Sequence, residues 1–104
     1  MTDLTKLTAR AAVDLLRRRE VSPLEMIDAA VARIEATDGP LNALPTLCVD
    51  RARAHAERIV EAGPAAGDGP SWLGGLPIAV KDLNDVASVR TTYGSPLFTD
   101  HVPD

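Results

Sequence analysis

The sequence has 104 residues, a formal net charge of -4, 45% hydrophobic residues and only 3% aromatic residues. This length suits at most one small domain, and the acidic balance argues against nucleic acid or an anionic membrane as partner, because both select clustered positive charge. No apolar run approaches the roughly 20 residues of a membrane span, and residues 1–10 lack the apolar centre of a signal peptide. The single cysteine permits no internal disulfide, so we expect a reduced, cytoplasmic protein.

The composition also argues against metal and cofactor chemistry. The two histidines, His55 and His101, lie far apart in the sequence, so neither a His-Glu-x-x-His zinc pattern nor a histidine pair is available. One cysteine is too few for a thiolate cluster. We therefore expect no metal and no cofactor.

The first part of the chain is predicted to be helical. Thr8 is suited to cap a first helix, whose apolar residues recur at helical spacing and lead to three consecutive arginines in the last turn. A second helix is predicted to begin at Ser22, with Glu25 completing a capping box. We expect this helix to stop at Gly39-Pro40.

Residues 41–49 contain Pro45 and alternate weakly between apolar and polar, which indicates an extended connector with room for a short strand. Asp50 is then expected to cap a third helix, which Gly63-Pro64 ends. Residues 63–71 consist of Gly, Pro, Ala, Asp and Ser, the composition of an exposed loop.

The apolar run 76–80 follows a Gly-Gly turn and predicts a short strand. A run without polar positions is typical of a strand covered on both faces, as in a parallel sheet. One strand makes no sheet, and these elements carry more apolar surface than they can cover among themselves. We therefore expect the chain either to oligomerise or to be the front part of a larger protein.

Lys81 directly follows this run. At the carboxyl end of a strand in an α/β sheet, side chains point into the crevice where ligands bind. A partly desolvated lysine there can lose its proton and act as a general base or a nucleophile, which arginine cannot do. The alternative, favoured by composition alone, is that Lys81 points to water and pairs with Asp82 or Asp85.

Two other groups of polar side chains follow Lys81 and have plainer interpretations. The first group consists of Asp82, Asn84 and Asp85. It lacks the turn glycine and the bidentate glutamate of a calcium-binding loop, so we expect a polar turn. The second group consists of Thr91, Thr92 and Ser95. No histidine lies nearby in the sequence to activate one of these hydroxyls, so we expect them to have structural roles in a turn or at a strand edge. His55 is expected to be a solvated helix residue, and Cys48 a small buried hydrophobe.

Several separated motifs resemble the amidase signature enzymes. Residues 73–82 read Leu-Gly-Gly-Leu-Pro-Ile-Ala-Val-Lys-Asp, which is similar to that family's Leu-x-Gly-(Ile/Leu)-Pro-(Ile/Val)-x-(Val/Ile)-Lys-Asp block, and residues 89–95 resemble its Thr-Thr-x-Gly-Ser stretch. Residues 22–25 and 32–35 resemble its second helix, and the resemblance extends over essentially the whole chain. Ser88 stands where the family commonly has glycine, in a turn that needs a positive φ.

The resemblance implies an α/β fold, with a mixed sheet flanked by helices, and an amide hydrolase that uses a Ser-Ser-Lys triad. Lys81 would be the base that acts through one serine on a second, nucleophilic serine, and Asp82 a structural or electrostatic neighbour. The family's serine-rich signature lies downstream of the matched block. We therefore expect residues 1–104 to be the N-terminal fragment of one amidase domain, helical over 1–62, a loop over 63–71 and strand and loop over 72–104, inactive by itself.

The expected partners are a small-molecule amide and either the rest of the amidase chain or a second copy, including a homodimer. Two alternatives stay open. The first is the A subunit of a tRNA-dependent amidotransferase, which resembles the amidases but passes ammonia to a partner subunit; residues 93–98 resemble the free-standing amidases more. The second is a non-catalytic helical fragment that associates through its Ala-rich faces.

Overall fold

The computed structural model describes residues 2–63 and 69–104 of the chain. Three α-helices lie in these ranges: α1 (Ala9–Arg17), α2 (Pro23–Leu41) and α3 (Val49–Ala62). Two short 3-10 helices, η1 (Leu4–Lys6) and η2 (Pro96–Phe98), lie near the ends of the sequence. None of the helices in the described ranges combines the length and the hydropathy that a membrane crossing requires.

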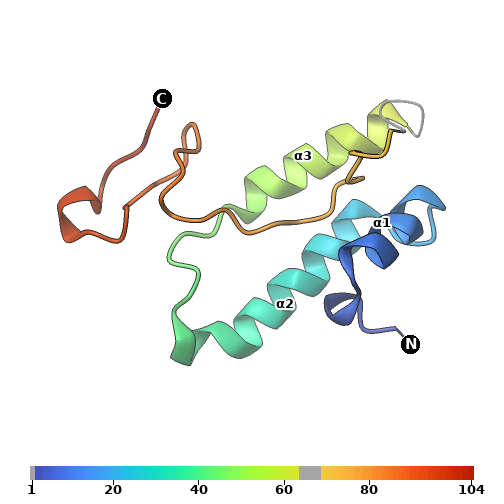
Figure 1. Cartoon of the computed structure of the whole chain (residues 1–104), viewed down its shortest axis with the longest axis horizontal. Coiled ribbons are helices and arrows are strands. Elements are labelled where there is room, and N and C mark those ends of the chain that lie inside the picture. Colours follow the sequence, from blue (N-terminus) through green and yellow to red (C-terminus); the bar gives the residue numbers. More distant parts are fainter. Residues whose placement is uncertain (1, 64–68) are drawn as a thin grey trace.

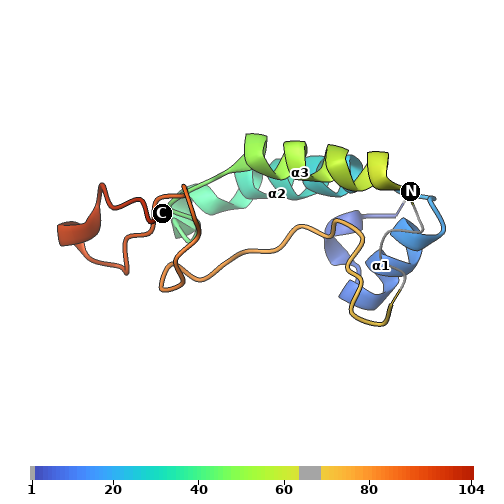
Figure 2. The same ribbon diagram turned by 90° about the horizontal axis from the view of Figure 1, so that it is seen from above.

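Helices α2 and α3 lie side by side, with α1 at one end of the pair (Figure 1). The Arg53 guanidinium of α3 lies 2.5 Å from the Asp28 carboxylate of α2 and ties the two helices together. Figure 2 shows that the segment after Trp72 runs along one face of this pair, away from α1. The C-terminal residues therefore form a lobe at the opposite end of the molecule from α1.

The predicted helix starts at Thr8 and Ser22 are confirmed. The Thr8 hydroxyl accepts a hydrogen bond from the Ala11 backbone N–H. Ser22 and Glu25 form the reciprocal capping box, in which the Ser22 hydroxyl accepts from the Glu25 N–H and the Glu25 carboxylate accepts from the Ser22 N–H. These caps satisfy backbone donors that a helix cannot pair internally, which is why the sequence signal is reliable.

The predicted helix stop at Gly39-Pro40 is wrong, because α2 continues to Leu41 with Pro40 inside its last turn. The helix ends where Asn42 adopts a left-handed conformation (φ 48°). The Asp38 carboxylate then accepts from the Ala43 N–H at 2.8 Å, which holds the chain after the helix. A side chain-to-backbone bond thus fixes this boundary, rather than the proline.

Two other helix boundaries differ from prediction, and one agrees with it. Helix α3 begins at Val49 with Cys48 in the N-cap position, so Asp50 lies in the first turn instead of capping it. Helix α1 ends at Arg17, and Arg19 takes a left-handed φ of 58° beyond it. The predicted end of the third helix is confirmed, since Gly63 caps α3. Residues 64–68 of the predicted loop lie outside the described residues.

The predicted α/β fold is wrong for this chain: the described residues form three helices and no strand. Residues 76–80 carry no helix or strand assignment, and no ladder pairs them with any described segment. Ile78 is 70% exposed and Val80 is 52% exposed, so the run is not covered on both faces. A strand exists only through hydrogen bonds to a neighbouring strand, and the sole pairing among the described residues is an isolated antiparallel bridge between Val86 and Val89.

A small hydrophobic core anchors the start of this segment to the helices. Buried Ala12, Leu16 and Met26 form its centre, and Trp72 and Leu76 pack against it. Gly74 and Gly75 lie between Trp72 and Leu76 and let the backbone of this segment come close to neighbouring side chains. A Cβ on Gly74 would lie 2.7 Å from the Trp72 ring, and a Cβ on Gly75 would lie 2.7 Å from Pro23 Cβ. The segment that leads to Lys81 is therefore fixed at its start by contact with α1 and α2.

Candidate functional site

Lys81 lines a hollow of about 1030 Å³. Helices α2 and α3 contribute apolar side chains to its wall, among them Ile27, Ile34 and Ala52. The extended segment 77–84 forms another wall. The lysine side chain is exposed, so the expected exit from a covered strand is replaced by a position at the edge of an apolar hollow.

Lys81 forms no ion pair with any residue in the described ranges, although Asp82 and Asp85 are close to it in sequence. The alternative interpretation is therefore correct in placing Lys81 in contact with water, but wrong in pairing it with one of these acids. Its backbone carbonyl accepts from the Asn84 N–H at 2.9 Å, which closes a tight turn. Both aspartates are bonded elsewhere, and their partners are two consecutive residues, Thr92 and Tyr93.

Asp82 is clamped to Thr92 by both of its carboxylate oxygens. Its Oδ1 accepts from the Thr92 backbone N–H at 2.8 Å, and its Oδ2 accepts from the Thr92 hydroxyl. The hydrogen bond from the Thr92 side chain, followed by that from its backbone, holds the pKa of Asp82 below its ordinary value of 3.8. The nearby positive charge of Arg90 acts in the same direction. Asp82 is therefore a structural anchor for the Lys81 turn.

Asp85 is bonded to the hydroxyl of Tyr93, which donates to its Oδ1. This hydrogen bond to the neutral phenol, followed by burial, raises the pKa of Tyr93 above its ordinary value of 10.0. The Tyr93 ring packs edge-on against Phe98, with ring centroids 5.0 Å apart, and lies 5.6 Å from the His101 ring. The aromatic cluster of the C-terminal lobe thus holds the second acidic side chain of the turn.

Backbone bonds connect this arrangement to the end of the chain and to the connector. The Thr91 N–H donates to the His101 carbonyl, and the Ser88 N–H donates to the Pro103 carbonyl, both at 2.9 Å. The Arg90 guanidinium donates to the Thr99 carbonyl and to the Thr46 hydroxyl. The Lys81 turn is therefore held by segments on both sides of it in the sequence.

The other candidates have structural roles, as expected for the hydroxyls. Thr91 is buried and donates to the Val89 carbonyl, and Ser95 accepts from the Leu97 N–H at the start of η2. His55 is exposed on α3, as predicted. The prediction of a buried Cys48 is wrong, because it is exposed at the start of α3. The described residues contain no group of three or more acidic, histidine or cysteine side chains placed to hold a metal ion.

Sequence reasoning misses the clamping roles of Tyr93 and Arg90. Tyr93 stands out only as part of a motif, and nothing in its neighbourhood in sequence indicates a bond to Asp85 eight residues earlier. The same holds for Arg90 and Thr46, which are 44 residues apart. A signal exists for Thr92 alone, since the Thr-Thr motif accompanies the Lys-Asp block.

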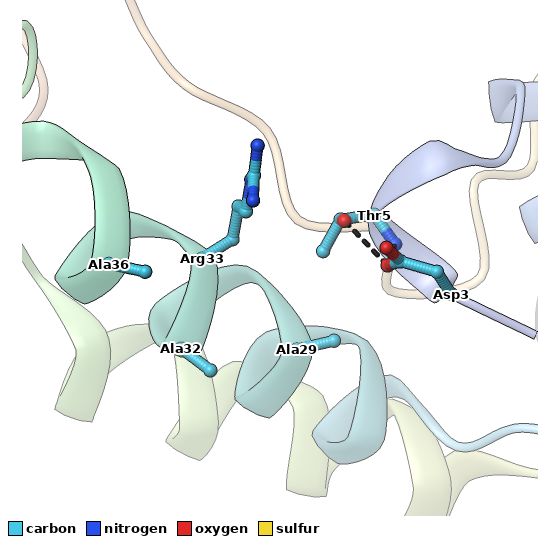
Figure 3. Close-up of a pocket in the computed structure, with 6 residues that line it drawn as sticks. All are labelled: Asp3, Thr5, Ala29, Ala32, Arg33 and Ala36. Carbon is cyan, nitrogen blue, oxygen red and sulfur yellow. Dashed lines mark hydrogen bonds between the residues drawn. The ribbon is translucent and has the colours of Figure 1, made fainter.

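A second, shallower depression of about 360 Å³ lies between η1 and α2 and shares no lining residue with the hollow at Lys81 (Figure 3). Methyl groups of three alanines of α2 form its floor, next to Arg33. The Asp3 carboxylate in it already accepts from the Thr5 backbone and hydroxyl. These bonds, the hydroxyl's first, lower the pKa of Asp3 from its ordinary value of 3.8. The depression offers no reactive group.

The sequence profile of the Amidase family matches residues 25–104. The chain belongs to this family. The matched range includes α2 from its third residue onward, α3, the hollow and the whole Lys81 turn, whereas η1 and α1 precede it. The family resemblance also placed Ser88 in a turn with a positive φ, and its φ of 63° confirms that expectation.

Relatives of two kinds match this Amidase-family chain. The A subunit of the glutamyl-tRNA(Gln) amidotransferase of Anaeromyxobacter dehalogenans is 41% identical over 101 residues, which cover 97% of this chain and 20% of the relative. The corresponding protein of Rhodospirillum rubrum is 43% identical over 102 residues, covering 98% and 20%. An amidase of Pseudomonas putida is 38% identical over 96 residues, covering 92% and 20%. The chain thus spans about a fifth of the length of these relatives, and no solved structure matches it.

Proposed function

We propose that this chain supplies the lysine base of an amide-hydrolysing site, with Lys81 in that role. The observation that carries the proposal is the position of Lys81. It lies in the block at 73–82 that resembles the amidase signature, and it borders the apolar hollow without a carboxylate partner among the described residues. A general base must hold its proton weakly, and a neighbouring carboxylate would oppose this.

In the proposed reaction, water and an amide give a carboxylic acid and an amine. The neutral Lys81 amine takes a proton, through an intervening serine, from the serine hydroxyl that attacks the amide carbonyl. We propose that both serines come from outside residues 1–104. Two features support this: the hydroxyls of Thr91, Thr92 and Ser95 have structural partners, and the chain spans only about a fifth of its relatives.

Substitution of Lys81 in the full-length protein tests this role. Lys81→Met and Lys81→Arg are both expected to lower the turnover of a small amide by about 100- to 10,000-fold, the usual contribution of a general base. Arginine keeps the charge but cannot give up its proton. Lys6→Met is the matched control, because Lys6 is the other lysine of the chain and forms an exposed ion pair with Asp3. Near-full turnover by Lys81→Arg would show that Lys81 is not the base.

A second candidate function, that of the amidotransferase A subunit, is favoured by the names of the relatives in Anaeromyxobacter and Rhodospirillum. The percentage of identical residues does not distinguish the two candidate functions, since the Pseudomonas amidase matches this chain almost as well as the amidotransferase subunits do. An amidase hydrolyses a small amide as the purified protein alone. An amidotransferase component is expected to release ammonia from its amide donor at full rate only after its partner subunits have been added.

A further inference from the structure

Two carboxylates lie within four residues of Lys81 in the sequence, yet neither is paired with it. Exposed lysine and aspartate side chains so close in a turn would ordinarily form a weak ion pair. Here Asp82 and Asp85 are both engaged by residues of one other turn, Thr92 and Tyr93. Both acidic residues next to Lys81 in the sequence are therefore bonded to other residues.

The hydrogen-bond directions at Thr92 are fully determined. Its hydroxyl oxygen accepts from the Gly94 N–H at 3.2 Å, so its single proton is directed to Asp82 Oδ2. Its backbone N–H takes the other carboxylate oxygen, Oδ1. Thr92 is only 8% exposed, so water does not compete effectively for these bonds. Both oxygens of Asp82 are thus committed to Thr92.

Besides Lys81 and Asp82, few ionisable groups line the hollow. The residues of α2 and α3 in its wall are all uncharged, the connector contributes Cys48, and the segment 86–94 contributes Arg90 and Tyr93. Arg90 is already bonded to the Thr99 carbonyl and the Thr46 hydroxyl. Asp82 is therefore the one carboxylate among the described residues that line the hollow, and Asp85 lies four residues from Lys81 in the same turn segment.

We infer that Thr92 and Tyr93 are positioning residues that keep Asp82 and Asp85 from pairing with Lys81, the residue proposed as the base. This inference rests on the proposed role of Lys81. A carboxylate released from Thr92 can pair with the ammonium form, and an opposite charge within about 4–6 Å favours that form. Loss of either restraint would therefore favour the protonated form of Lys81, which cannot accept a proton.

The test is the pH dependence of kcat/KM in the full-length protein. Thr92→Val removes the hydroxyl with little change of volume and is expected to move the acidic limb of the profile upward by about 0.5–1 pH unit, at the low end of the effect of a charge partner because the site is exposed. Thr91→Val is the matched control. Thr91 is also a buried threonine, at 2% exposed, but its hydroxyl donates to the Val89 carbonyl and restrains no carboxylate. Its acidic limb is expected to stay in place.

Tyr93→Phe keeps the test decisive if Thr92→Val does not fold, and a double variant checks the cause of the shift. Tyr93→Phe releases Asp85 while keeping the ring that packs on Phe98, and should move the limb in the same direction. In an Asp82→Asn background, Thr92→Val should cause no shift, because no carboxylate is released. A fall in activity that is uniform across pH, or an equal shift in Thr91→Val, would overturn the inference.

The outcome also separates this inference from the proposed function. If Lys81→Met keeps full activity, the role of Lys81 as base fails. If Lys81 is essential but neither Thr92→Val nor Tyr93→Phe moves the acidic limb, only the positioning role of these two residues fails.

Discussion

The contact between Gly75 and the start of α2 gives a prediction whose size follows from the geometry. Gly75 has a φ of 91°, and a Cβ built on it would lie 2.7 Å from Pro23 Cβ and 2.9 Å from Pro23 Cγ. An alanine here meets two penalties: about 1–2 kcal/mol for a side chain at positive φ and about 1–3 kcal/mol for overpacking against a rigid ring. Gly75→Ala is therefore expected to lower the free energy of unfolding by about 2–5 kcal/mol.

Two other glycines separate these penalties. Gly63 has a φ of 75° and a ψ of 177° but nothing within 4 Å of the added Cβ, so Gly63→Ala carries the backbone cost alone, about 1–3 kcal/mol. Gly39 lies in the last turns of α2, also with nothing within 4 Å, so Gly39→Ala is expected to stabilise the helix by up to about 1 kcal/mol. Each of the three variants adds one methyl group to the unmodified chain, so only the surroundings of that group differ between them.

Urea unfolding measured by the fluorescence of Trp72, the single tryptophan of the chain, reports on this packing directly, because Trp72 packs against the same core. The expected order of stability is Gly39→Ala, then the unmodified chain, then Gly63→Ala, then Gly75→Ala. If Gly75→Ala unfolds at the same urea concentration as Gly63→Ala, the close approach to Pro23 does not constrain the segment that carries Lys81, and the reasoning is refuted.

Two further predictions concern the C-terminal lobe. The bond to Asp85 and burial raise the pKa of Tyr93. The stability that this bond contributes is therefore present below pH 10 and is lost as the pH rises through the raised pKa. In a pH titration followed by phenolate absorbance, Tyr93 should ionise at a higher pH than it does in Asp85→Asn, and identical titration curves would contradict the bond. Ser88→Gly should raise the free energy of unfolding by up to about 1 kcal/mol, since Ser88 has a φ of 63°; thermal unfolding measures this, and a loss of stability would show that the serine is not strained.

Local features of the helices could be predicted from the sequence because the interactions that make them are local. The caps at Thr8 and Ser22 depend on residues at most three positions away. The predicted end of α2 is wrong because the boundary depends on the Asp38 carboxylate reaching the Ala43 N–H and on Asn42 tolerating a left-handed conformation. Gly39-Pro40 has the composition of a stop, but α2 includes both residues and ends one residue after the proline.

The candidate site could be predicted only in part. The motif around Lys81 indicates the residue, and the family match covers it. The bonds that hold its neighbours could not be predicted, because they join Asp82 to Thr92 and Asp85 to Tyr93 across a folded loop. The same sequence pattern allows a plain ion pair with Lys81, and local spacing alone cannot choose between the two arrangements.

The sequence by itself determined where helices α1 and α2 begin, that Lys81 follows an apolar run, and which family these motifs indicate, because each depends on residue types at short spacing. Tertiary structure alone decided whether that apolar run becomes a strand and which partners the acidic side chains take. A strand needs hydrogen bonds from a second segment, and a carboxylate bonds whichever donor the fold brings to it. In the described residues the fold provides a hydroxyl and a phenol for the two aspartates, and no partner strand for residues 76–80.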